Sequence, residues 1–162
     1  MGSIFNNIDK FVTIEAWAKT DSISNLPGSD LYLITGKCAA GSYWVFGFYA
    51  GENSNGVDAD ASTTFYESGG PTAGSAGGGS IGSIKAGRWY HVLATRDDRT
   101  FKVYIDGVEK DSTTSNPNSV ANTAPFQIAA KCSWYNFNGT IDDVRVYDRA
   151  LEPDELYIMK QE

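Results

Sequence analysis

Short segments with strand-forming patterns recur along almost the whole chain, and only the last ten residues have a helical pattern. The clearest segment is 11–19, in which Val12, Ile14, Ala16 and Ala18 fall on one face and larger polar or aromatic residues fall on the other. Further strands are predicted at 31–37, 43–50, 62–66, 89–95, 101–105, 108–110, 126–131 and 140–147. This series of short strands predicts an all-β fold, a sandwich or jelly roll with a short C-terminal helix.

The connections between these strands carry typical turn and loop residues. Asp106-Gly107 predicts a tight hairpin turn between two strands. Residues 67–87 contain eight glycines and 111–123 are rich in Ser, Thr and Asn, so both stretches are predicted to be loops. A helix is predicted to start at 152–155, where Pro153 takes the first helical position and acidic residues follow it.

Length and charge limit the domain organisation and the partners. A chain of 162 residues fits one domain, and neither side of the glycine-rich stretch has enough strands to close a sandwich alone. Residues 1–162 are therefore predicted to be a single domain, with residues 1–3 interpreted as an expression scar. The formal net charge of −7 argues against nucleic acid or an anionic membrane as partner, and no apolar run is long enough for membrane insertion.

The two cysteines, Cys38 and Cys132, lie far apart in the sequence and in no metal-binding or redox motif. A disulfide between them would close a loop of about 94 residues, nominally worth roughly 4–5 kcal/mol. We predict this disulfide, and the alternative is two buried free thiols.

Three stretches resemble the laminin G-like branch of the concanavalin A-like lectin/glucanase superfamily. They are 11–19 (FVTIEAWAK), 87–95 (GRWYHVLAT) followed by 101–107 (FKVYIDG), and 137–151 (FNGTIDDVRVYDRAL). The resemblance implies a jelly-roll β-sandwich of two antiparallel sheets in which the first and last of these strands are adjacent. It also implies a module that binds glycans or proteins, often with a calcium ion at the rim. The chain departs from the family in having only ten residues before Phe11, where an extra strand with an acidic residue is usual.

Catalysis is not expected. His91 is the only histidine, and its place within a strand indicates a structural, core-like role. Glucanases of this superfamily need two cooperating carboxyl groups, whereas adjacent residues such as Asp142 and Asp143 on a strand point to opposite faces. Glu15 and Arg145 are expected to form a cross-strand ion pair on a half-exposed face, worth under about 1 kcal/mol, with contact to a sugar as the alternative.

A calcium ion (Ca²⁺) is the one cofactor considered, and Asp142 is its candidate ligand. Asp142 shares its parity with Val144 and Val146, so its carboxylate is expected to point towards the interior. There it would either accept backbone N–H bonds near the rim or bind the ion.

Aromatic residues outside regular strand positions are the main candidates for ligand binding. Trp134, Tyr135 and Asn136 lie in a connection between two strands, and Tyr43 and Trp44 open another strand. Sugar rings stack on aromatic faces, and an amide both donates to and accepts from hydroxyl groups. If the predicted disulfide forms, it would hold these two segments at one edge of the sandwich.

The function predicted from the sequence is that of a non-catalytic, lectin-like carbohydrate-binding module whose partner is a glycan or polysaccharide, with calcium as a candidate stabilising ion. The alternative is a protein-interaction or adhesion domain that binds a protein surface. In both cases we expect a module of a larger secreted or cell-surface protein. Trp17 and Trp89 lie in strand motifs and are assigned to the core or the sheet surface.

Overall fold

The computed structural model describes the backbone of residues 11–21, 30–39, 42–50, 61–68, 74–78, 84–114, 124–131, 135–152 and 154–155. Side chains are described at residues 11–21, 34–37, 46–47, 84–114, 124–129, 137–152 and 154–155. In these segments, no helix has the length and apolar character needed to cross a membrane.

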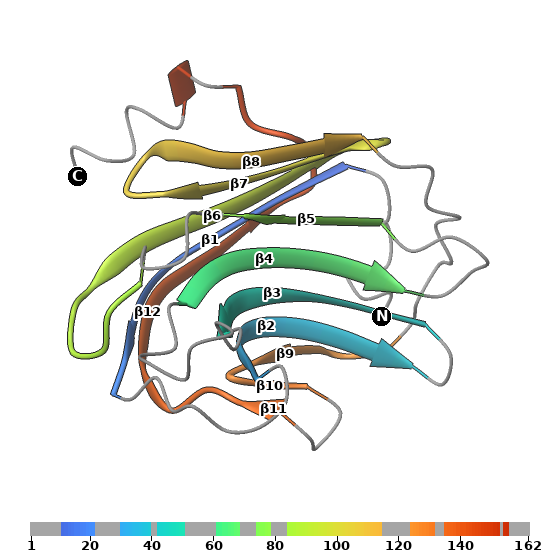
Figure 1. Ribbon diagram of the computed structural model, residues 1–162. Helices are drawn as coiled ribbons and strands as arrows, with labels where there is room; N and C mark the ends of the chain where they lie inside the picture. Colours follow the sequence, from blue (N-terminus) through green and yellow to red (C-terminus); the bar gives the residue numbers. More distant parts are fainter. Residues whose placement is uncertain are drawn as a thin grey trace, which may run out of the picture.

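Two five-stranded sheets face each other (Figure 1). The first has the order β12-β1-β6-β7-β8 and consists of β1 (Phe11–Thr20), β6 (Tyr90–Asp97), β7 (Thr100–Ile105), β8 (Val108–Thr114) and β12 (Gly139–Tyr147). The second has the order β5-β4-β3-β2-β9 and consists of β2 (Asp30–Ala39), β3 (Ser42–Ala50), β4 (Ala61–Ser68), β5 (Gly74–Gly78) and β9 (Phe126–Ile128). A small hairpin pairs β10 (Ala130–Lys131) with β11 (Tyr135–Asn136). The neighbouring strands pair antiparallel, so the predicted β-sandwich of two antiparallel sheets is confirmed.

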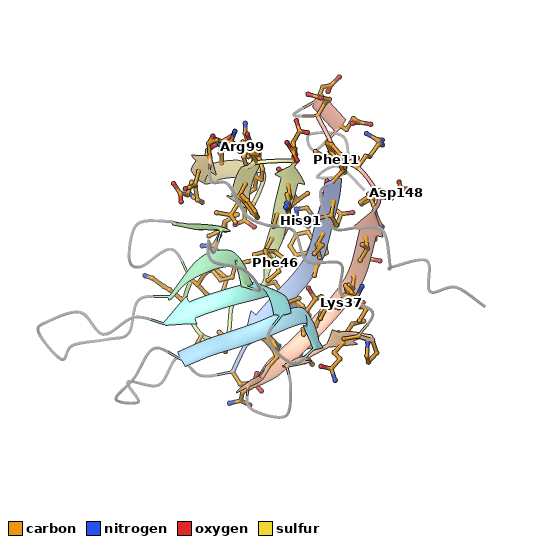
Figure 2. The ribbon with its side chains drawn as sticks, turned by 90° about the vertical axis from the view of Figure 1, so that its right-hand side faces the viewer. Phe11, Lys37, Phe46, His91, Arg99 and Asp148 are labelled. Atoms are coloured by element: carbon orange, nitrogen blue, oxygen red, sulfur yellow. The ribbon has the colours of Figure 1, made fainter. Side chains whose placement is uncertain are left out.

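The core between the sheets follows the alternation predicted for the first strand. Its members from β1 are Val12, Ile14, Ala16 and Ala18, all 2% exposed or less. They pack with alternate residues of β6 and β7 and with Ile34 and Phe46 of the second sheet. Figure 2 shows Phe46 between the sheets, where it is fully buried. Alternate strand positions thus build one shared hydrophobic layer, the main stabilising feature of a sandwich.

Two stretches predicted to be loops are partly strands. β5, at Gly74–Gly78, pairs with β4, and β8 continues to Thr114, beyond the start of the predicted loop at 111. Glycine has low strand propensity, but its backbone N–H and C=O groups remain available to a neighbouring strand edge. Pairing of β5 with β4 and of β8 with β7, the strands that precede them in the chain, therefore outweighed local composition.

Three further predictions concern the hairpin turn, the pairing of the first and last strands, and the C-terminal helix. At the predicted hairpin, Asp106 and Gly107 both have positive φ (51° and 73°), as a type I′ turn requires, which confirms that prediction. β1 lies beside β12, as the family resemblance implies. Asp154 and Glu155 are the helical residues within the described segments, so the longer predicted C-terminal helix stays a prediction.

Candidate functional site

Four of the predicted binding residues lie on two strands that both neighbour β2. Tyr43 and Trp44 belong to β3, and Tyr135 and Asn136 belong to β11. Their side chains, and Trp134 entirely, lie outside the described residues, so this site stays a prediction. The hairpin of β10 and β11 lies beside β2 (Figure 1).

The backbone gives the relative level of the two aromatic segments along β2. Tyr43 pairs with Cys38, whereas the hairpin is joined to β2 through the Ala129 N–H, which donates to the Ile34 carbonyl at 2.9 Å. Cys38 and Ile34 are four positions apart, roughly 13 Å along a strand. Long aromatic side chains would have to span that offset to form one wall.

The predicted disulfide lies in the same region. β9 pairs with β2 antiparallel, with Phe126 opposite Lys37 and Ile128 opposite Thr35, so the chain leaves the level of Cys38 as it approaches β10. Cys132 lies outside the described residues, and the bridge stays a prediction.

On the other sheet, the face that points away from the core carries a buried carboxylate. Glu15 is 2% exposed, although its alternation had predicted a half-exposed position. Its Oε1 accepts a hydrogen bond from the Tyr147 hydroxyl at 2.8 Å, and its Oε2 accepts one from His91 Nε2 at 3.1 Å. The Arg145 guanidinium lies 3.6 Å from Oε1. The predicted Glu15–Arg145 pair therefore exists, but the prediction that it is a half-exposed pair is wrong for Glu15.

The segment after β12 explains this burial, because it crosses the outer face of β1 and β6. The Thr13 hydroxyl accepts a hydrogen bond from the Leu151 N–H and donates one to the Arg149 carbonyl, both at 2.9 Å. Leu151 packs with Leu93 and Tyr104 in a second hydrophobic cluster. Both faces of the central strands are thus covered at this end of the sheet, and only the inner face was expected to be.

The environment of Glu15 stabilises its charged form. Burial alone would raise the pKa of Glu15, but the hydrogen bonds from His91 and Tyr147, together with electrostatic attraction to His91 and to the Arg145 guanidinium, hold it below its usual value. An ionised, fully hydrogen-bonded carboxylate cannot act as a general acid near neutral pH. The cluster is therefore suited to fixing side-chain positions rather than to proton transfer.

His91 is buried, as a structural histidine should be, but it does not belong to the core between the sheets. It is 8% exposed and lies on β6 (Figure 2). It pairs there with Trp17 of β1. Its backbone N–H donates to Asp106 Oδ1 at 3.0 Å, and its ring lies 5.3 Å from the Trp17 ring. His91 thus links the buried carboxylate to an exposed aromatic side chain.

The expected inward orientation of Asp142 is wrong. Trp17 pairs with Asp142 and Glu15 pairs with Arg145, so one residue of β1 is opposite two residues of β12, and Asp143 has a φ of 52°. This β-bulge resets the alternation, which makes Asp142 exposed while Val144 still faces the core. The Asp142 carboxylate accepts the Asp143 N–H at 2.8 Å, the backbone contact expected in the absence of calcium.

The same bulge bears on metal binding and on the glucanase alternative. Asp143 is also exposed, and its carboxylate lies 3.3 Å from the Arg145 guanidinium. Asp142 and Asp143 therefore do not point to opposite faces of the sheet, and the expectation from regular alternation is wrong for this pair. Among the described residues, no three His, Cys, Asp or Glu side chains converge as a metal site would need. Calcium binding at Asp142 therefore stays a prediction.

Two exposed aromatic side chains lie on the same outer face as Glu15 and His91. Trp17 is 39% exposed and Trp89 is 38% exposed, which places both on the sheet surface, one of the two positions expected for them. The Lys19 ammonium lies 5.4 Å from the centre of the Trp89 ring. Trp17 of β1 and Trp89, just before β6, thus lie exposed on a face that the sequence pattern did not single out.

Comparison with known families identifies the chain. A family model described as the concanavalin A-like lectin/glucanases superfamily matches residues 5–157. The chain belongs to this superfamily. The resemblance in the three sequence stretches is thereby confirmed.

Solved structures with the same fold include several carbohydrate-binding proteins. One is domain 4 of AbnA, an extracellular GH43 arabinanase from Geobacillus stearothermophilus, in complex with arabinotriose (TM-score 0.68, 23% identity, 94% of this chain and 67% of that chain). Another is the CBM40 of the Ruminococcus gnavus IT-sialidase bound to α2,3-sialyllactose (TM-score 0.69, 12% identity, 94% of this chain and 85% of that chain). A sialidase of Trypanosoma rangeli also matches (TM-score 0.59, 21% identity, 94% of this chain), but this chain covers only 23% of it. At these identities the similarity establishes the fold.

Proposed function

We propose that this chain is a non-catalytic carbohydrate-binding module of a larger extracellular protein. The observation that carries the proposal is the fold match over 94% of the chain to two modules that hold an oligosaccharide. The match to a small part of a much longer sialidase supports the role of a module within a larger protein. Because related folds carry different functions, the chain's own aromatic residues decide where a glycan would bind.

The proposed primary site is formed by Trp134, Tyr135 and Asn136 together with Tyr43 or Trp44. Its support is the position of β11 beside β2, the strand that pairs with the start of β3. Aromatic faces would stack on sugar rings, and the Asn136 amide would bind hydroxyl groups.

A glycan array with the purified module tests the function, and Trp134→Ala tests the site. We expect selective binding of at least one glycan and a loss of about 1–3 kcal/mol of binding free energy in Trp134→Ala, by analogy with stacking on nucleic-acid bases. Trp134→Phe, which keeps an aromatic face, should retain part of the affinity. Equal glycan binding by Trp134→Ala and the parent would remove this site, and binding of proteins but no glycan would favour an adhesion domain.

The proposed disulfide has a separate test. Titration of thiols in denaturant should detect none before reduction and two after it, as expected for a bridge between Cys38 and Cys132. Two thiols without reductant would show that the aromatic segments are not held together by a covalent bond. A bridge requires Cα atoms within about 7 Å. Free thiols would therefore also agree with the four-residue offset between Cys38 and the point where the chain before β10 bonds to β2.

A further inference from the structure

The outer face of the first sheet carries a compact group of side chains with no role in the core. We call it the tryptophan patch: Trp17 and Lys19 of β1, Trp89 just before β6, and Thr140 and Asp142 of β12. Trp17 pairs with Asp142, and Lys19 pairs with Thr140, so these residues lie in two adjacent rows across the strands. Lys19 reaches Trp89 with its ammonium group.

The two tryptophans are exposed without a packing reason. Both are more than a third exposed, while smaller residues of β1 and β6 fill the core between the sheets. Diagonal neighbours on adjacent antiparallel strands are about 7–8 Å apart, so the two indole rings can contact one ligand together. Large aromatic groups left exposed side by side are typical of binding surfaces.

The Trp17 ring packs against the ring of His91. The ring of His91 lies 5.3 Å from it at an angle of 50°, and His91 itself is held by Glu15 and by Asp106. Because these contacts limit the motion of His91, Trp17 rests on a fixed neighbour. A ring positioned before the ligand arrives loses less entropy on binding.

The charges of the patch indicate the class of ligand. The arginines nearby are paired, Arg88 with Asp106 and Arg145 with Glu15 and Asp143. Lys19, in contrast, has no carboxylate partner in the described part of the chain, where its ammonium group lies over the Trp89 ring. The Lys19 ammonium group is the positive charge of the patch and is complementary to an anion on the ligand.

We infer that the tryptophan patch is a second glycan-binding surface, which takes an acidic polysaccharide whose sugar rings carry carboxylate groups. The apolar faces of successive sugars stack on Trp17 and Trp89, and a sugar carboxylate pairs with Lys19. Asp142, on the far side of Trp17, accepts hydrogen bonds from hydroxyl groups and disfavours a carboxylate there, which orients the ring. This inference rests on the proposed function but uses a different face of the sandwich from the primary site.

A galacturonan and its methyl ester provide matched probes, since they share one backbone and differ in the carboxylate charge. Calorimetry with galacturonan oligomers is carried out in EDTA, so that calcium cannot bridge protein and ligand. Trp17→Ala and Trp89→Ala should each weaken binding at least about tenfold. Lys19→Met should weaken binding of the acid about tenfold and leave binding of the ester unchanged, and the parent should prefer the acid.

Phe11→Ala is the matched control, because Phe11 is an exposed aromatic residue on the same strand (45% exposed) but at its other end. It should bind like the parent, and Trp134→Ala should retain binding of the galacturonan. Equal affinity for acid and ester, or full binding by the Trp17 and Trp89 variants, would overturn the inference. If the parent binds other glycans through Trp134 and no galacturonan, the inference fails and the proposed function stands. If it binds no glycan at all, both fail.

Discussion

Glu15→Gln keeps the shape of a buried side chain on the outer face of the first sheet but removes its charge. In the parent, the carboxylate accepts hydrogen bonds from Tyr147 at 2.8 Å and from His91 at 3.1 Å, and Arg145 lies 3.6 Å away. The amide of Gln has one acceptor oxygen, so its NH₂ group meets either the Tyr147 hydroxyl or His91 Nε2. That contact is kept only if the hydroxyl or the His91 tautomer reverses its role, and both contacts lose the negative charge of their acceptor.

The magnitude follows from these contacts. Hydrogen bonds to charged groups contribute about 1.5–3 kcal/mol each, and a buried donor left unpaired adds a desolvation penalty. Arg145 contributes little, because its side chain is 42% exposed and remains hydrated. We expect Glu15→Gln to lower the free energy of unfolding by about 2–3 kcal/mol at pH 7, more than the value under about 1 kcal/mol that an exposed pair would give.

Urea unfolding at a series of pH values is the assay, and an unchanged m-value would show that the unfolded state is comparable. A double-mutant cycle with Tyr147→Phe, which removes only the hydroxyl donor, should give a coupling of about 1–2 kcal/mol. Because the pKa of Glu15 is lowered in the folded state, its stabilisation is present above the ordinary value of 4.5 and is lost as the pH falls through the folded value. The difference between parent and variant should therefore shrink in acid. A difference below about 0.5 kcal/mol at pH 7, or one independent of pH, would refute a stabilising buried carboxylate.

Three further outcomes are expected. Thr13→Val should lower the free energy of unfolding by about 1–3 kcal/mol because the Leu151 N–H loses its partner, whereas Thr13→Ser should stay close to the parent in urea unfolding. Gly139→Ala should prevent folding or reduce the melting temperature strongly, since its Cβ would lie 2.1 Å from the Lys19 carbonyl oxygen at a φ of 155°. Calcium should leave the melting temperature unchanged if the described surroundings of Asp142 are complete, and a rise in the parent that is absent in Asp142→Ala would instead establish that residue as a ligand.

Local sequence patterns correctly predicted the inner face of β1 and the hairpin turn after β7. The alternation of Val12, Ile14 and Ala16 placed the inner face of β1 correctly, because the side-chain period of a strand is two and only apolar residues can fill the space between the sheets. The turn at Asp106-Gly107 was equally predictable, since both positions require positive φ.

Alternation failed where a distant segment changed the geometry. Asp142 was assigned to the interior by parity with Val144, but a β-bulge opposite Ala16 separates the two and turns Asp142 outward. Nothing in the local sequence marks a bulge, because it depends on the register of β12 against β1. The exposed surface formed by Trp17 and Trp89 was missed for the same reason, since only strand pairing brings them together.

The sequence by itself determined the all-β class, most of the strand positions and the family, because short-range periodicity and turn chemistry are local properties of the chain. The tertiary structure decided which polar residues are buried. Glu15 and Thr13 lie on a face that alternation marks as exposed, and they are covered because the segment around Leu151 returns across β1. Burial is set by what packs against a side chain, and the segments that do so here are separated by more than a hundred residues.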